Sequence, residues 1–200
     1  MRPDSIVFAI AGMCFGIILG WVIGEQQGST RQVATTTAGS AATGGQAAPV
    51  LDEARVQSLM TVIKNDPKNA GAALELANTY FDAERYADAI KWYEASLQID
   101  PSNPNASTDL GVSYYYSGQV DRALERFAAS LELDPKHTKT LLNQGIVLAF
   151  GKQDLAGAQE AWKQVVALAP ESPEGQAARR ALEGVEAAGH TTGTAATPGS

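Results

Sequence analysis

The side chains that could do chemistry are few in this sequence and lie far apart. The histidines are His137 and His190, and the single cysteine is Cys14. A zinc site needs three or four such ligands at short, defined spacings. No arrangement of that kind surrounds either histidine, so we predict no metal site. Cys14 lies inside an apolar run and is best explained as an apolar residue of that run.

Two pairs of carboxylates lie close together in the sequence, Asp52 with Glu53 and Asp82 with Glu84. Paired carboxylates can act as general acid and base. The first pair precedes a predicted helix, where acidic residues interact favourably with the helix dipole, and the second fits a solvated helix surface. Phosphate-loop, nucleophile-elbow and zinc-helix motifs are missing from the sequence. We therefore predict that the protein is not an enzyme, has no catalytic residue and takes no cofactor.

The composition of the chain is uneven and divides it into four zones, which indicate where elements that could position functional side chains lie. Residues 6–23 hold no charge, 25–50 are rich in Gly, Ser, Thr, Ala and Gln, 51–188 are mixed and periodic, and 189–200 return to small residues. The net charge of −7 lies in 51–188, because the charges elsewhere cancel. Only this zone can build a core, and an acidic domain without a basic stripe argues against nucleic acid as partner.

The apolar run, IVFAIAGMCFGIILGWVI, is eighteen residues long. As a helix it would span about 27 Å, close to the ~30 Å hydrocarbon layer of a bilayer. A cleaved signal peptide is the alternative, although its apolar part is usually only about 7–15 residues. We predict a retained transmembrane anchor. Arg2 before the run and Glu25 after it favour a cytoplasmic N-terminus at the inner (plasma) membrane, with the remainder in the periplasm or outside.

Small residues at helical spacing mark this run. Gly12, Gly16 and Gly20 lie four residues apart, and Gly24 continues the series at the predicted membrane interface. Such small-xxx-small steps let a second helix approach closely. They predict a helix-contact surface at Gly12, Gly16 and Gly20 and a possible homodimer.

The low-complexity zones flank the periodic one. Residues 25–50 cannot bury enough apolar surface to offset their conformational entropy, which predicts a flexible linker spanning about 25–30 Å. Residues 189–200 are predicted to form a disordered tail.

The periodic zone contains an internal repeat. Asp-Pro occurs three times, and its prolines, Pro67, Pro101 and Pro135, are 34 residues apart, with Pro170 35 residues later. Because proline cannot continue a helix, each Asp-Pro predicts the end of one unit and the start of the next.

Within each unit the same residue types recur at the same positions. The second unit shows this best, with Leu110, Gly111, Tyr114, Ala123, Phe127 and Pro135. The set resembles the tetratricopeptide-repeat family, whose pattern is W-x2-L-G-x2-Y, then A-x3-F, then P over 34 residues. In the first unit Ala73 and Ala77 replace the Trp and the Gly, and the third unit has one extra residue, which we expect in the turn FGKQDLAG.

The resemblance implies an all-α solenoid of helical hairpins behind the N-terminal transmembrane helix. We expect repeats over about 70–103, 104–137 and 138–171, with end helices at 51–65 and 173–187. Ser172 and Pro173 predict the cap and the first residue of the last helix. In each repeat a small residue on the first helix (Ala77, Gly111 or Gly145) would let that helix approach its neighbours, and an aromatic residue on the second helix would fill the gap between repeats.

In the family, the first helix of each repeat lines a groove that holds a peptide or helix of a partner. The positions that face this groove correspond here to Leu74, Asn78, Phe81, Asn105, Val112, Tyr115, Tyr116, Lys139, Leu142, Ile146 and Phe150.

This set is mainly apolar and aromatic, with few of the cations that some relatives use to grip a C-terminal carboxylate. It therefore suits an amphipathic helix or an extended apolar segment. The alternative is that the protein's own helices cover the surface.

The resemblance thus implies a membrane-tethered scaffold or assembly factor that binds another protein. In architecture it is similar to membrane-anchored bacterial proteins with repeats of this kind, including those that hold apocytochrome during cytochrome c biogenesis. Two alternatives remain open: a self-assembling structural protein, and a cytosol-facing receptor on an organelle membrane.

Overall fold

The computed structural model of the chain describes residues 49–193. The predicted membrane run 6–23, with Gly12, Gly16 and Gly20, and nearly all of the predicted linker lie outside this range. Within 49–193, no helix combines the length and the apolar composition that crossing a membrane requires.

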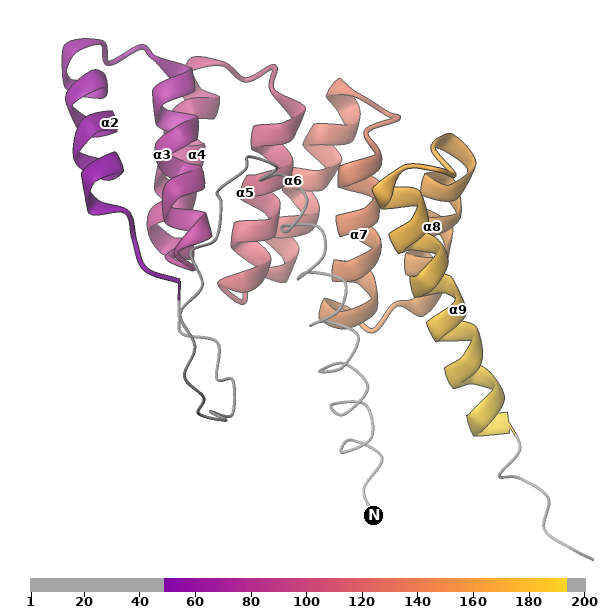
Figure 1. Ribbon diagram of the computed structural model, residues 1–200. Helices are drawn as coiled ribbons and strands as arrows, with labels where there is room; N and C mark the ends of the chain where they lie inside the picture. Colours follow the sequence, from indigo (N-terminus) through magenta and orange to yellow (C-terminus); the bar gives the residue numbers. More distant parts are fainter. Residues whose placement is uncertain (1–48, 194–200) are drawn as a thin grey trace, which may run out of the picture. The chain divides into compact units, whose positions relative to one another are not determined.

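Residues 49–193 fold into eight α-helices (Figure 1). Their bounds are α2 Glu53–Asn65, α3 Ala70–Asp82, α4 Tyr86–Ile99, α5 Pro104–Tyr116, α6 Val120–Leu133, α7 Thr138–Gly151, α8 Leu155–Leu168 and α9 Pro173–Gly193. The prediction of an all-α helical-hairpin solenoid is confirmed for this part of the chain.

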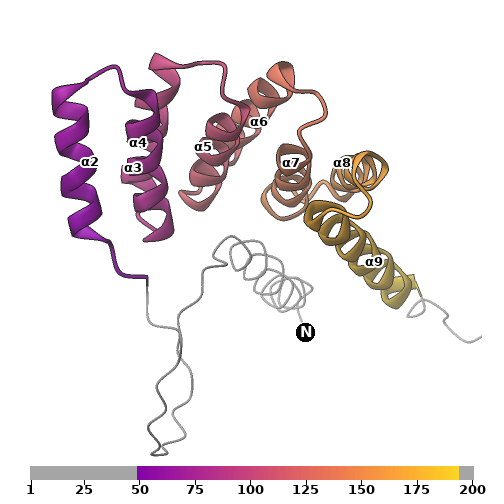
Figure 2. The same cartoon turned by 45° about the horizontal axis from the view of Figure 1, so that its top comes forward.

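The helices form two layers. We call α3, α5 and α7 the A helices and α4, α6 and α8 the B helices; each A helix packs against the B helix that follows it. In Figure 2 the A helices lie along one side of the domain and the B helices behind them. Helix α5 also contacts α7, and α7 contacts α9. We call the exposed side of the A helices the A face.

Polar side chains set the helix ends. Asn69 and Asn103 accept hydrogen bonds from the amides of Ala72 and Ala106 at 2.9 and 3.1 Å, which caps α3 and α5. At the start of α9, the predicted cap Ser172 accepts from the Gly175 amide at 3.0 Å.

The Asp-Pro pairs end the B helices. Asp100 and Asp134 are the C-cap residues of α4 and α6, and their carboxylates accept from the amides of Ser102 and Lys136, both at 3.0 Å. Each Asp-Pro therefore both stops a helix and holds the next turn.

The core of each repeat pairs a small residue of the A helix with an aromatic residue of the B helix. Phe127 and Trp162 are at most 1% exposed. A methyl group on Gly111 would lie 2.5 Å from the ring of Phe127, and one on Gly145 would lie 2.6 Å from Cδ1 of Trp162. Glycine is therefore required at both positions for the two helices to approach this closely.

Two local features differ from the expectation. The extra residue of the third repeat lengthens α7 to Gly151, so the turn before α8 keeps three residues like the turns before α4 and α6. Helix α9 continues to Gly193, past the predicted end at residue 187 and into the predicted tail. A glycine inside a helix costs only about 1 kcal/mol, so Gly189 is not a sufficient stop signal.

Candidate functional site

The predicted groove residues all lie on the A helices, but at different depths. Val112, Leu142 and Ile146 are at most 9% exposed, and Val112 belongs to the hydrophobic core. Asn105 is exposed, and Phe150 is 36% exposed. The positions carried over from the family pattern therefore differ widely in exposure, which the pattern itself does not specify.

Aromatic side chains gather where α3 and α5 end and α4 begins. The rings of Tyr86 and Tyr116 are stacked, with centroids 4.8 Å apart and planes 14° from parallel. Phe81 meets both rings edge-on, at 5.5 and 6.3 Å, and Tyr115 lies 5.7 Å from Tyr116. We call these four residues the aromatic cluster.

Three members of the aromatic cluster were predicted from the sequence, and Tyr86 was not. Tyr86 begins a B helix, and the family pattern assigns no partner contact to that position. The sequence feature that could have identified Tyr86 is its position directly after the short turn that follows Phe81. This turn brings the rings of Phe81 and Tyr86 together.

The hydroxyl groups of this cluster stay protonated. Burial raises the pKa of Tyr116, and the neighbouring Tyr86, Tyr115 and Glu84 raise it further. Burial also raises the pKa values of Tyr86 and Tyr115. The cluster is therefore an uncharged surface of ring faces and hydroxyl groups at physiological pH.

The predicted polar residues of the A face have partners within the domain. Asn78 accepts a hydrogen bond from the Tyr93 hydroxyl at 2.6 Å. The Lys139 ammonium lies 2.6 Å from the carboxylate of Asp109. A lysine already paired with a carboxylate is poorly placed to grip the C-terminal carboxylate of a peptide.

A buried group of hydroxyls joins the second and third repeats. Thr108 lies 3.0 Å from Ser130 and 2.6 Å from Thr140, measured between hydroxyl oxygens, and none of the three residues is solvent-exposed. The ring of His137 connects this group to the A face: Nδ1 lies 2.6 Å from the Thr140 hydroxyl and Nε2 lies 3.2 Å from Oδ1 of Asn105. The sequence analysis considered His137 only as a possible metal ligand and did not predict this contact.

Acidification should weaken the fold through His137. Burial is the main cause that lowers the pKa of His137, so between this pKa and about 6.5 the unfolded chain binds more protons than the folded one. The contribution of neutral His137 to the free energy of unfolding is therefore complete above about pH 6.5. It is lost as the pH falls toward the pKa of His137 in the folded protein. The free energy of unfolding, measured by urea titration from pH 7.5 to 5.5, should fall more steeply for the native chain than for His137→Gln; parallel curves would contradict this role.

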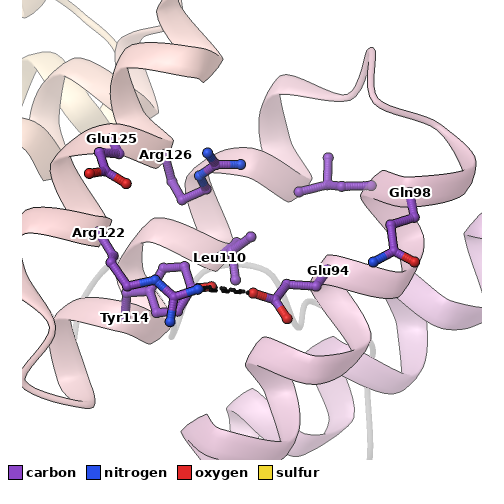
Figure 3. A pocket seen from close by; sticks show the side chains of 8 residues that line it. Glu94, Gln98, Leu110, Tyr114, Arg122, Glu125 and Arg126 are labelled. Atoms are coloured by element: carbon purple, nitrogen blue, oxygen red, sulfur yellow. Dashed lines mark hydrogen bonds and ion pairs between the residues drawn. The ribbon is translucent and has the colours of Figure 1, made fainter.

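A cleft of about 430 Å³ lies on the B-helix side and is lined by residues of α4, α5 and α6 (Figure 3). The Arg122 guanidinium lies 4.0 Å from the centre of the Tyr114 ring and 3.2 Å from the Glu94 carboxylate. The Tyr114 hydroxyl donates to the same carboxylate, and burial together with this bond raises the pKa of Tyr114 to about 12. The charged groups at this end of the cleft are thus already paired with one another, which favours a structural role.

No group of three or more His, Cys, Asp and Glu side chains is arranged to hold a metal ion within the described range. The stacked helical hairpins, the small-to-aromatic packing and the aromatic A face define a class of protein: a repeat scaffold that presents one helix per repeat on one surface.

Comparisons with known proteins identify the repeat. A family model described as TPR repeat matches residues 77–118, and one described as tetratricopeptide repeat matches residues 108–173. Residues 77–173 are therefore similar to tetratricopeptide repeats, a family of stacked helical hairpins whose extended concave surfaces bind other proteins. No curated protein matches the chain significantly.

Several solved structures share the fold. The Sgt2 TPR domain from Aspergillus fumigatus is 26% identical, with a TM-score of 0.57 over 66% of this chain and 85% of that one. The first TPR domain of human RPAP3 is 25% identical, with a TM-score of 0.56 over 64% and 98%. The first TPR of Spaghetti (RPAP3), bound to the HSP90 peptide SRMEEVD, is 26% identical, with a TM-score of 0.55 over 62% and 94%.

Proposed function

We propose that this chain is a scaffold or assembly factor whose A face binds a helix or an apolar peptide segment of a partner protein. The observation that carries this proposal is the aromatic cluster of Phe81, Tyr86, Tyr115 and Tyr116. Aromatic side chains give large contact area at a low cost in side-chain entropy and are enriched among the residues that dominate binding energy.

The related domain of Spaghetti supports the general mode of binding, since it holds a peptide. Its peptide, SRMEEVD, is acidic. On the A face described here Lys139 is paired with Asp109, and Asn78 is engaged by Tyr93. The partner segment of this chain is therefore expected to be held by ring contacts rather than through an acidic terminus.

The membrane part of the proposal rests on the sequence. Residues 6–23 would anchor the chain in the inner membrane, and 25–50 would let the repeats reach a partner near the membrane surface. Maturation of envelope proteins, such as cytochrome c biogenesis, is a process that needs such a tethered scaffold. Protease accessibility of the linker around Arg31 in intact cells tests the proposed orientation.

Removing the rings should abolish capture of the partner. A photo-crosslinking amino acid at the exposed Asn105 should yield a defined crosslinked partner in native membranes. In the Phe81→Ala, Tyr116→Ala double variant this product should fall by about tenfold or more, the loss expected for residues at the centre of an interface. Circular dichroism and thermal melting establish that the variant is folded at the assay temperature.

The matched control removes apolar groups from another surface. Leu133 and Leu168, at the ends of the B helices, are 47% and 41% exposed. Leu133→Ala with Leu168→Ala should leave the crosslinked product unchanged. An undiminished product in the folded Phe81→Ala, Tyr116→Ala variant would refute binding at the A face.

A further inference from the structure

Carboxylates border the aromatic cluster. Asp82 is the last residue of α3, and Glu84 lies in the turn between Phe81 and Tyr86; both are exposed. The charge of Glu84 contributes to the raised pKa values of both Tyr86 and Tyr116. The amide of Glu84 also donates to the carbonyl of Phe81 at 2.8 Å, so the turn holds Glu84 next to the aromatic cluster.

A third carboxylate, Asp109, is neutralised by a lysine, so the charge at this border comes from Asp82 and Glu84. Partial burial of the carboxyl group is the main cause that raises the pKa of Asp82, and the charge of Asp109 on α5 raises it further. Lys139 neutralises Asp109 at 2.6 Å, and Arg55, the cation whose charge lowers the pKa of Asp82, donates to Glu75 at 2.5 Å. Asp82 and Glu84 take part in none of the ion pairs found within residues 49–193.

Ring faces and carboxylates attract the same kind of ligand. The face of an aromatic ring carries partial negative charge and attracts ammonium and guanidinium groups, and adjacent carboxylates strengthen this attraction. An acidic segment would meet like charge here, which disfavours binding. The net charge of −7 of the chain acts in the same direction over longer distances.

We infer that the partner segment carries a lysine or arginine beside its apolar residues, and that this cation docks at the aromatic cluster between Asp82 and Glu84. This inference rests on the proposed function and narrows it to a basic, apolar segment, in contrast to the acidic peptide of the Spaghetti domain.

A display selection tests the inference without knowledge of the partner. Random 16-residue peptides on phage are selected against the immobilised full-length chain in detergent. Enriched sequences should combine apolar residues with Lys or Arg. Their binding, followed by fluorescence anisotropy with synthetic peptides, should weaken as salt is raised, because salt screens exposed charges.

Variants that neutralise the two carboxylates test where the cation of the peptide docks. Asp82→Asn with Glu84→Gln should weaken binding of an enriched peptide by about 3- to 10-fold, as expected for two partly exposed ion pairs. Glu132→Gln with Glu183→Gln makes the same change in net charge at exposed positions of α6 and α9 and should have no effect.

The outcomes separate this inference from the proposed function. One possible result is that peptide binding is lost in the Phe81→Ala, Tyr116→Ala variant although the enriched peptides lack basic residues. In that case Asp82→Asn with Glu84→Gln would bind the peptides as tightly as its control variant does. The basic partner is then refuted and the A-face scaffold stands. Peptides that bind equally well to the Phe81→Ala, Tyr116→Ala variant would refute both.

Discussion

Replacing Trp162 with alanine should lower the free energy of unfolding by about 3–5 kcal/mol, the usual cost of removing a large aromatic side chain from a core. Trp162 is 1% exposed, and its indole Nε1 donates a hydrogen bond to the carbonyl of Leu142 at 3.2 Å. Alanine would leave a cavity between α7 and α8 and would remove this hydrogen bond. Urea unfolding followed by circular dichroism measures the loss.

Leu155→Ala is the control for this measurement. Leu155 begins the same helix and is 50% exposed, so its truncation should change the free energy of unfolding by no more than about 0.5 kcal/mol. A loss below about 1 kcal/mol for Trp162→Ala would show that the third repeat is not packed around this side chain.

Adding one methyl group at Gly145 should destabilise the domain by about 1–3 kcal/mol, although alanine is the better helix former by about 1 kcal/mol. The methyl group would overlap the indole of Trp162, which is 1% exposed, so the two helices or the ring would have to shift. Gly184→Ala is the matched control, because no heavy atom lies within 4 Å of the added methyl group. That variant should be neutral or slightly stabilising.

The first repeat supplies a compensating change for Gly145→Ala. There Ala77 and Tyr93 occupy the positions of Gly145 and Trp162, and both are at most 1% exposed. Combining Gly145→Ala with Trp162→Tyr should therefore recover part of the stability that Gly145→Ala alone loses. Strict additivity of the two changes in urea unfolding would rule out direct contact as the cause.

These two positions also show why so much of the fold follows from the sequence. A small residue on an A helix and an aromatic one on its B helix are close in the chain, and their packing is repeated three times. The Asp-Pro stops act locally through the missing amide of proline and the capping carboxylate. Helices α3, α5 and α7 accordingly begin at Ala70, Pro104 and Thr138, the residues at which the repeats were predicted to start.

The site was less predictable than the fold. The family positions place Leu142 and Ile146 on the same face as Asn105, yet the first two are buried and the third is exposed. Exposure depends on how closely neighbouring repeats approach, which a pattern within one repeat does not contain. For the same reason Tyr86 was missed, since its contact with Tyr116 crosses from one repeat to the next.

The sequence by itself determined the repeat length, the first residues of α3, α5 and α7, and the small and aromatic positions of each repeat, because these depend on backbone chemistry and on residue types within one hairpin. Only the tertiary structure decided that Tyr86 stacks on Tyr116 and that His137 joins the buried hydroxyls to Asn105. Both arrangements link neighbouring repeats. Their geometry is fixed by the angle and distance at which one hairpin packs on the next, and these arise from many side chains acting together.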